Sequence, residues 1–235
     1  MPQALAVEHL VTALISGDRA DARDSLRDAI NNGYSAEATA ERLVWPAALT
    51  LDSFWRKDQI ERSAYQGAVL MLSQLVQRLE CGYTRAPQHG KVYVVVSGTE
   101  AGETLAGEIF SGLAEAAGAE VVFLGPCGDA DDLFSALSRR APDAFVAFAS
   151  SAGDAPRLRA LINRLRTTGA IPGLMIAFGG GVFARAPGLA EEMGADLWAD
   201  DPFELVRSLG SRSTTTRDST QATRAACRER RRNAA

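Results

Sequence analysis

This chain of 235 residues has few of the side chains that most often bind metals or form disulfides. It contains 2 histidines, His9 and His89, and 3 cysteines, Cys81, Cys127 and Cys227. So few scattered cysteines exclude a disulfide framework and a closed zinc site, and we expect reduced thiols. No apolar run approaches the ~18 residues that span a bilayer, and the amino terminus lacks the basic and apolar regions of a signal peptide. We therefore expect no membrane partner and a cytoplasmic location.

Positive charge is also in slight deficit. The chain carries 25 Lys and Arg against 29 Asp and Glu, with a formal net charge of -4. This balance argues against a general nucleic-acid-binding surface on the body of the protein. The exception is the segment 211–235, which is rich in Ser, Thr and Arg and too poor in large apolar residues to order itself. We expect a disordered basic tail. The alternative is that this tail contacts nucleic acid or an acidic partner.

Residues 1–82 are predicted to form a helical bundle. Apolar residues recur there at helical spacing, and Asp18 and Ser35 are helix-start signals. The short connections favour antiparallel packing of the helices. A segment with Gly and Pro as breakers then leads to residue 91. The expected helices span 3–16, 18–32, 35–44, 46–57 and 60–81.

From residue 91 to residue 210, strand-like and helix-like segments alternate. Five such repeats predict an α/β fold with a flavodoxin-like (Rossmann-type) five-stranded parallel sheet and helices on both faces. Three loops of small residues, 97–102, 149–153 and 179–181, should meet at the carboxyl ends of the strands, where such sheets bind ligands. The expected strands are 92–96, 120–124, 144–149, 174–178 and 196–199, and the expected helices are about 103–117, 129–139, 155–168, 184–193 and 203–209.

The order and spacing of these loops resemble a known family over about residues 5–209. The chain is similar to the cobalamin-binding module of methionine synthase, small methyltransferase corrinoid proteins and CarH-type light sensors. In that family the first loop reads Asp-x-His-x-x-Gly, a later loop carries Ser-x-Leu, and a Gly-Gly pair follows the fourth strand. The resemblance implies a cobalamin cofactor, adenosylcobalamin or methylcobalamin. The matching or adjacent positions here are Ser97, Gly98, Thr99, Gly102, Ser150, Ser151, Gly179, Gly180 and Gly181.

Thr99 stands where the family has its cobalt-binding histidine. In the family this histidine binds cobalt from below, and the Asp before it orients the imidazole. Because a threonine hydroxyl is a poor neutral donor, we expect no protein ligand to a metal here. The small residues that would admit the nucleotide tail of cobalamin between the sheet and the glycine loops are present. Another tetrapyrrole, haem or a linear bilin, is the alternative ligand.

The resemblance also implies a lid on the upper face of the ligand. In CarH-type sensors a bundle helix carries Trp and, some ten residues later, Glu-His. The corresponding positions are Phe54 and the pair Ala64-Tyr65. Phe54, Trp55 and Tyr65 are therefore expected to cap a flat macrocycle by stacking, with packing between bundle and sheet as the alternative.

No residue pattern indicates catalysis. The loop 98–102 lacks the Lys and Ser/Thr of a phosphate-binding loop, and no Ser/His/Asp arrangement is visible. We therefore expect a sensor or regulator of signalling or transcription rather than an enzyme. Its bound tetrapyrrole, or the light that the ligand absorbs, would change bundle packing, oligomerisation or contact with a protein partner. The alternatives are a corrinoid methyl-carrier subunit of a methyltransferase and a ligand-free interaction module that kept the fold.

Overall fold

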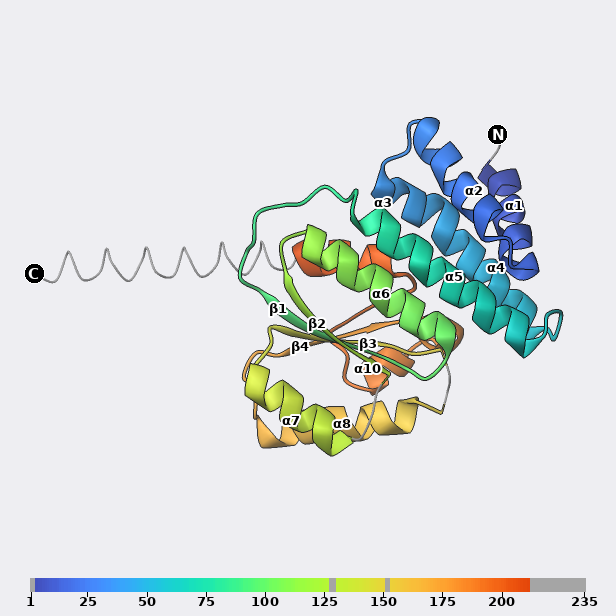
Figure 1. Ribbon diagram of the computed structural model, residues 1–235. Helices are drawn as coiled ribbons and strands as arrows, with labels where there is room; N and C mark the ends of the chain where they lie inside the picture. The colour runs from blue at the N-terminus through green and yellow to red at the C-terminus, as the bar shows by residue number, and fades with distance from the viewer. Residues whose placement is uncertain (1–2, 127–129, 151–152, 212–235) are drawn as a thin grey trace, which may run out of the picture.

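The amino-terminal part of the chain is helical, as its apolar spacing predicts (Figure 1). The computed structural model describes residues 3–126, 130–150 and 153–211, so the predictions for Ser151 and for the tail beyond 211 lie outside the described residues. Asp18 and Ser35 cap helices as expected: their side chains accept hydrogen bonds from backbone N–H groups of the following turn. The helices are α1 (Gln3–Ser16), α2 (Arg19–Asn31), α3 (Ala36–Thr39), η1 (Ala40–Val44), α4 (Trp45–Arg56) and α5 (Arg62–Glu80).

The prediction of separate helices over 35–44 and 46–57 was wrong. Helix α3, the π-helical turn η1 and α4 follow one another without a break. Pro46 has no N–H to offer the carbonyl of Arg42 four residues earlier. That carbonyl instead accepts a hydrogen bond of 2.9 Å from the side-chain amide of Gln3 in α1. The helix therefore continues through the proline because a π turn and a side chain from another helix compensate for the missing donor.

The second part of the chain confirms the predicted fold class, an α/β fold in which a helical bundle precedes a flavodoxin-like sheet. The five strands are all parallel and lie in the order β2-β1-β3-β4-β5. A further helix covers residues 202–211. The elements are β1 (Val92–Ser97), α6 (Ala101–Ala116), β2 (Glu120–Pro126), α7 (Ala130–Arg140), β3 (Ala144–Phe148), α8 (Ala155–Thr168), β4 (Met175–Gly179), α9 (Gly181–Arg185), α10 (Leu189–Glu192) and β5 (Leu197–Ala199).

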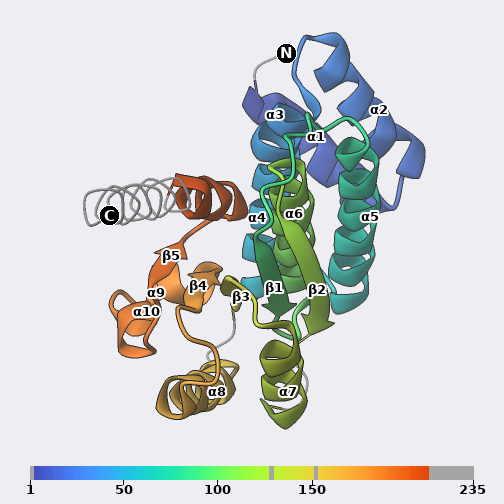
Figure 2. The same cartoon turned by 90° about the vertical axis from the view of Figure 1, so that its left-hand side faces the viewer.

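Helices cover both faces of the sheet (Figures 1 and 2). Helices α7 and α8 pack on one face, where Val94 and Phe145 join their core. Helix α6 and the helix 202–211 pack on the other face, with Val95 and Val146. Alternate residues of each central strand therefore enter opposite cores, which is why these strands read as continuous apolar runs.

The bundle rests on α6 rather than directly on the sheet (Figure 2). Leu105 and Ile109 of α6 belong to the same buried cluster as Leu72 of α5. Because α6 begins at the ligand edge of the sheet, this packing holds α4 above that edge. None of the helices in the described ranges is both long and apolar enough to cross a membrane.

The single helix predicted over 184–193 is also a correction, since the structure has two short helices there, α9 and α10. Pro187 disfavours a helical residue before it, and Gly188 takes a left-handed φ of +87°. Helix α9 follows β4 directly, so it stays close to the ligand edge.

Candidate ligand-binding cleft

The structure brings three of the predicted small-residue loops together at the carboxyl ends of β1, β3 and β4. The N–H of Gly98 donates to the carbonyl of Phe148 over 2.7 Å, and the N–H of Ala149 donates to the carbonyl of Gly179 over 3.0 Å. The backbones of the loops are thus hydrogen-bonded to one another. Small side chains are needed here because the loops approach so closely.

A cleft of about 290 Å³ lies between this edge and helix α4. Four segments of the α/β part and one bundle helix contribute to it, so the cleft exists only where the two parts of the chain meet. Sites of this kind at the carboxyl edge of a parallel sheet are the usual ligand sites of the fold. The lining residues are Trp45, Ala48, Leu49, Asp52, Gly102, Glu103, Ala106, Phe148, Ser150, Gly180, Gly181, Arg185, Asp200 and Asp201.

Phe148 gives the cleft an apolar wall. Its ring centroid lies 5.6 Å from that of Phe110, and the residue is 1% exposed. A Cβ built on Gly179 would lie 2.7 Å from the Phe148 Cδ1 atom, so any larger residue at 179 would displace the ring. With Ala106 and Gly102 beside it, this wall is suited to a flat apolar group.

The charged lining of the cleft is mostly acidic. Asp52, Glu103, Asp200 and Asp201 contribute carboxylates, and Arg185 is the basic residue among the described lining residues. The Arg185 guanidinium donates to the carbonyl of Ser150 over 2.5 Å. Burial, followed by the nearby charge of Arg56, lowers the pKa of Arg185 from its ordinary value. The lining therefore favours neutral or hydrogen-bond-donating ligand groups over anionic ones.

Glu103 ties two of the loops together. It is 1% exposed, and it accepts hydrogen bonds from the N–H of Glu100, over 2.9 Å, and from the N–H of Ser150. With Glu100 it forms a capping box at the start of α6. The Glu-x-x-Glu spacing was a sequence signal for that cap. The contact with Ser150, 47 residues away, was not visible in the sequence.

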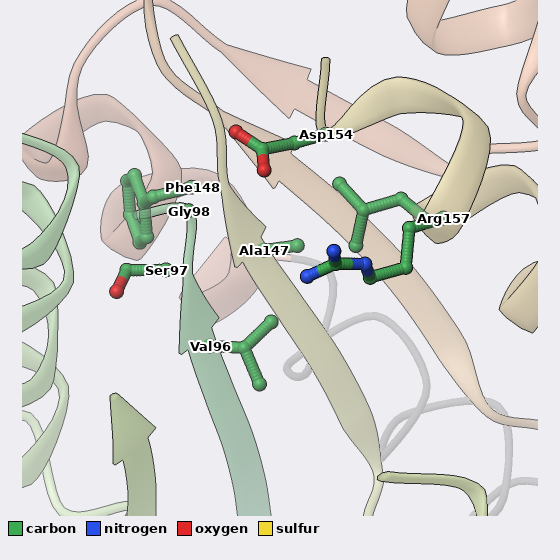
Figure 3. Close-up of a pocket in the computed structure, with 8 residues that line it drawn as sticks. Val96, Ser97, Gly98, Ala147, Phe148, Asp154 and Arg157 are labelled. Carbon is green, nitrogen blue, oxygen red and sulfur yellow. The ribbon is translucent and has the colours of Figure 1, made fainter. Parts of the chain in front are cut away.

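A narrow crevice lies below the loops, between β1, β3 and the start of α8 (Figure 3). Its volume is about 10 Å³. Figure 3 shows the Asp154 carboxylate pointing toward the end of β1. Its Oδ2 atom is buried without a hydrogen-bond partner among the described residues, 2.6 Å from where a Cβ on Gly98 would lie. The residues that line the crevice are Val96, Ser97, Gly98, Ala147, Phe148, Asp154, Arg157 and Leu158.

The predicted loop residues fall into three groups. Gly102, Ser150, Gly180 and Gly181 line the cleft. Ser97 and Gly98 line the crevice below it, and Gly179 is buried beside Phe148. Thr99 is exposed and lines neither space, and Ser151 lies outside the described residues.

The predicted aromatic lid does not line the cleft. Phe54 packs against the bundle core, and the rings of Trp55 and Tyr65 stack with centroids 5.4 Å apart. Tyr65 is 3% exposed, and burial, with the charges of Asp52 and Glu100, raises the pKa of its hydroxyl to about 12. In this structure they pack in the bundle core, which includes residues of α6, and the Tyr65 hydroxyl lies beside Gly102 at the start of that helix.

Helix α4 presents other side chains to the cleft. Trp45, Leu49 and Asp52 follow one another at helical spacing, and all three line it. The helical spacing of these residues is visible in the sequence. Which face of α4 lines the cleft is not, because that depends on how the helix packs.

No imidazole lies at the cleft. His9 sits between α1 and α2, with its ring nitrogens 3.2 Å from the Ser25 hydroxyl and 3.4 Å from an Asp21 oxygen. His89 precedes β1 at the opposite end of the sheet, where its backbone N–H donates to the carbonyl of Gly118. Within the described ranges no group of three or more His, Cys, Asp or Glu side chains is placed to hold a metal ion.

Comparison with known proteins identifies the fold. No family model and no curated protein matches this sequence. Among solved structures, the chain is similar to the monomethylamine corrinoid protein of Methanosarcina barkeri, with a TM-score of 0.76 and 15% identity over 88% of this chain and 98% of that one. The chain has the fold of a corrinoid protein. The likeness includes the bundle as well as the sheet, because it covers almost all of both chains.

Two further similar structures have lower TM-scores. One is a cobalamin-binding protein from Desulfitobacterium hafniense DCB-2, with a TM-score of 0.46 and 15% identity over 86% of this chain and 96% of that one. The other is the methanol:cobalamin methyltransferase complex MtaBC from Methanosarcina barkeri, with a TM-score of 0.44 and 15% identity over 88% of this chain and 79% of that one.

Proposed function

We propose that this chain binds cobalamin in the cleft between α4 and the sheet and acts as a corrinoid methyl carrier for a methyltransferase partner. The observation that carries this proposal is the cleft itself, which combines an apolar wall at Phe148 with a rim of hydrogen-bond acceptors. A corrin ring has apolar faces and an edge of primary amides, and amides donate hydrogen bonds. Asp200, Asp201 and Asp52 would accept them.

The charge of the lining favours cobalamin over the other tetrapyrroles. Haem and biliverdin carry propionates, whereas the peripheral groups of a corrin are neutral amides. Four carboxylates line the cleft, with Arg185 as their basic neighbour. A propionate placed there would lose its hydration and meet like charges, and both effects oppose binding.

The carrier role is supported over the sensor role by two observations. The fold likeness to a monomethylamine corrinoid protein extends over 98% of that chain. Phe54, Trp55 and Tyr65, which are expected to form the lid of a light sensor, are not among the residues that line the cleft. Bound cobalamin supplies a cobalt centre that accepts and releases a methyl group. Leu49, which is 52% exposed, adds apolar surface at the rim of the cleft.

The test is ligand retention by the full chain and by two matched variants. The protein is incubated with methylcobalamin, adenosylcobalamin, haem or biliverdin and desalted. It is then examined by absorption spectroscopy and by size-exclusion chromatography, in the dark and after illumination. We expect retention of the cobalamins only. The Ala48→Trp variant fills the cleft and should bind methylcobalamin about tenfold more weakly or worse. The Leu70→Trp variant places the same ring at an exposed position of α5 outside the cleft and should bind normally.

Each other outcome has a definite meaning. Retention of haem or biliverdin would contradict the electrostatic argument. A cobalamin complex that changes its elution volume on illumination would favour the sensor role. Retention of no tetrapyrrole would leave an interaction module that kept the fold.

A further inference from the structure

A second cavity lies between helices of the bundle. Its volume is about 310 Å³, against about 290 Å³ for the cleft, and the two share no lining residue among those that the structure describes. It opens between α1, α2 and η1, and Figures 1 and 2 show α1 and α2 on the side of the bundle away from the sheet. Ala6 of α1 and Ala29 of α2 line it, and their short side chains leave the space unfilled. A cavity of this size accommodates a small organic molecule.

One part of this bundle cavity is apolar. Leu43 of η1 is 3% exposed, and Ala6 and Ala29 are half-buried. The half-buried ring of Tyr34 adds an aromatic surface, and the Arg42 guanidinium lies 5.7 Å from the centroid of that ring. Burial of the carbon part of a ligand against these side chains would favour binding.

The bundle cavity also presents two unmatched charges. The carboxylate of Asp28 lines it from α2, and the guanidinium of Arg42 lines it from η1. Within the described part of the chain neither side chain forms an ion pair, so the two do not pair with each other. His9 lines the cavity too, but its ring nitrogens are already held, 3.2 Å from the Ser25 hydroxyl and 3.4 Å from an Asp21 oxygen. One carboxylate and one guanidinium are therefore available to a ligand.

Hydrogen bonds fix the backbone of both charged residues. The side-chain amide of Gln3 donates to the carbonyl of Arg42 over 2.9 Å. The side-chain amide of Asn32 donates to the carbonyl of Asp28 over 2.7 Å. Gln3 and Asn32 also line the cavity. The two charges thus extend from an anchored main chain, which reduces the entropy that a ligand must remove on binding.

We propose that this cavity binds a free α-amino acid with an apolar side chain. Its carboxylate accepts hydrogen bonds from Arg42, and its ammonium group donates to Asp28. Its side chain lies against Leu43 and Tyr34. A zwitterion matches both charges at once, whereas a simple amine is repelled by the guanidinium and a simple carboxylate by Asp28. The proposal does not depend on cobalamin binding, because the cavity and the cleft are lined by different residues.

The experiment is a calorimetric titration of the full chain with matched small molecules. The amino acids are L-leucine, L-methionine and L-phenylalanine. Isoamylamine is leucine without its carboxylate, and isocaproate is leucine without its ammonium group. We expect L-leucine to bind and each of these two analogues to bind at least about tenfold more weakly. Failure of all three amino acids to bind would overturn the proposal, and so would an analogue that binds as tightly as L-leucine.

Variants locate the binding site. Arg42→Gln and Asp28→Asn each remove one charge from the cavity and should weaken L-leucine binding at least about tenfold. The matched controls are Arg27→Gln and Asp24→Asn, which make the same changes at an exposed ion pair of 2.8 Å outside the cavity. Because such a pair contributes little to stability, both controls should fold and bind L-leucine normally. Unchanged affinity in Arg42→Gln and Asp28→Asn, or equal weakening in the controls, would contradict the assignment of the ligand to this cavity.

Discussion

At the scale of single residues, Gly180 and Gly188 show how the surroundings of a glycine determine the stability cost of replacing it. Both adopt a positive φ, of +109° and +87°. A Cβ on Gly180 would lie 3.0 Å from the carbonyl carbon of Ala149, whereas a Cβ on Gly188 would meet no atom within 4 Å. The Gly188→Ala variant should therefore lose only the cost of a left-handed backbone, about 1–2 kcal/mol. The Gly180→Ala variant should lose about 1–3 kcal/mol more through overpacking.

Urea unfolding of the two variants measures this difference directly. Gly188→Ala is the comparison variant, because it places a Cβ on a left-handed backbone (φ +87°, ψ −13°) without a collision, whereas Gly180 (φ +109°, ψ 163°) also lies in a region essentially restricted to glycine. Equal losses would mean that the Ala149 loop moves away at little cost, and would contradict the close packing seen between the β3 and β4 loops. A larger loss for Gly180→Ala is expected from the close approach of the Ala149 backbone together with the glycine-only conformation at position 180.

At the scale of the elements, prediction succeeded where the period was regular and local signals agreed. The predicted helix 155–168 coincides with α8 (Ala155–Thr168), which Gly169 ends with a φ of +59°. Prediction failed where a distant residue decided the outcome. The helix passes through Pro46 because Gln3, 39 residues from Arg42, satisfies its carbonyl. A sequence window around Pro46 does not contain that partner.

Part of the candidate site could likewise be predicted from the sequence, and part of it could not. The meeting of the three loops follows from parallel topology, which the alternation of strands and helices predicts. The face of α4 that lines the cleft does not follow, because the rotation of a helix about its axis is set by its packing. Tyr65 and Trp55 stack inside the bundle interface, and Trp45 and Leu49 are turned to the cleft instead.

The hydrogen bond from Gln3 to Arg42 leads to a prediction about the stability of η1. Removing the Gln3 amide should cost about 1 kcal/mol, because the Arg42 carbonyl then loses its protein donor. In a Pro46→Ala background the backbone N–H at position 46 can donate to that same carbonyl. The Gln3→Ala change should therefore cost much less there. Urea unfolding of the wild type, the two single variants and the double variant forms the cycle that measures this coupling.

The outcome of the cycle is unambiguous. A loss for Gln3→Ala that is the same in both backgrounds would mean that Gln3 contributes independently of the proline. A smaller loss in the Pro46→Ala background would show that α1 compensates for the missing backbone donor.

At the scale of the whole molecule, the bundle and the sheet share one structural element. The sequence suggested a boundary between residues 82 and 91, but α6 belongs to both cores: Leu105 and Ile109 face the bundle, and Phe110 faces the sheet. The carboxylate of Glu41 in η1 also pairs with Arg207 of the last described helix over 2.9 Å. Exposed ion pairs contribute little, so the shared apolar surface of α6 is the main connection.

This shared core predicts a single cooperative unfolding transition, which the 3 tryptophans can test. The Trp198→Phe variant leaves reporters only in α4, and the Trp45→Phe, Trp55→Phe double variant leaves a reporter only in β5. Both fluorescence signals should share one urea midpoint. Adding Ile109→Ala, at a residue 0% exposed, should reduce the free energy of unfolding by about 2–5 kcal/mol and so lower both urea midpoints equally. If only the α4 signal moved, the bundle would unfold separately, and the cleft between the two parts would open without loss of the sheet.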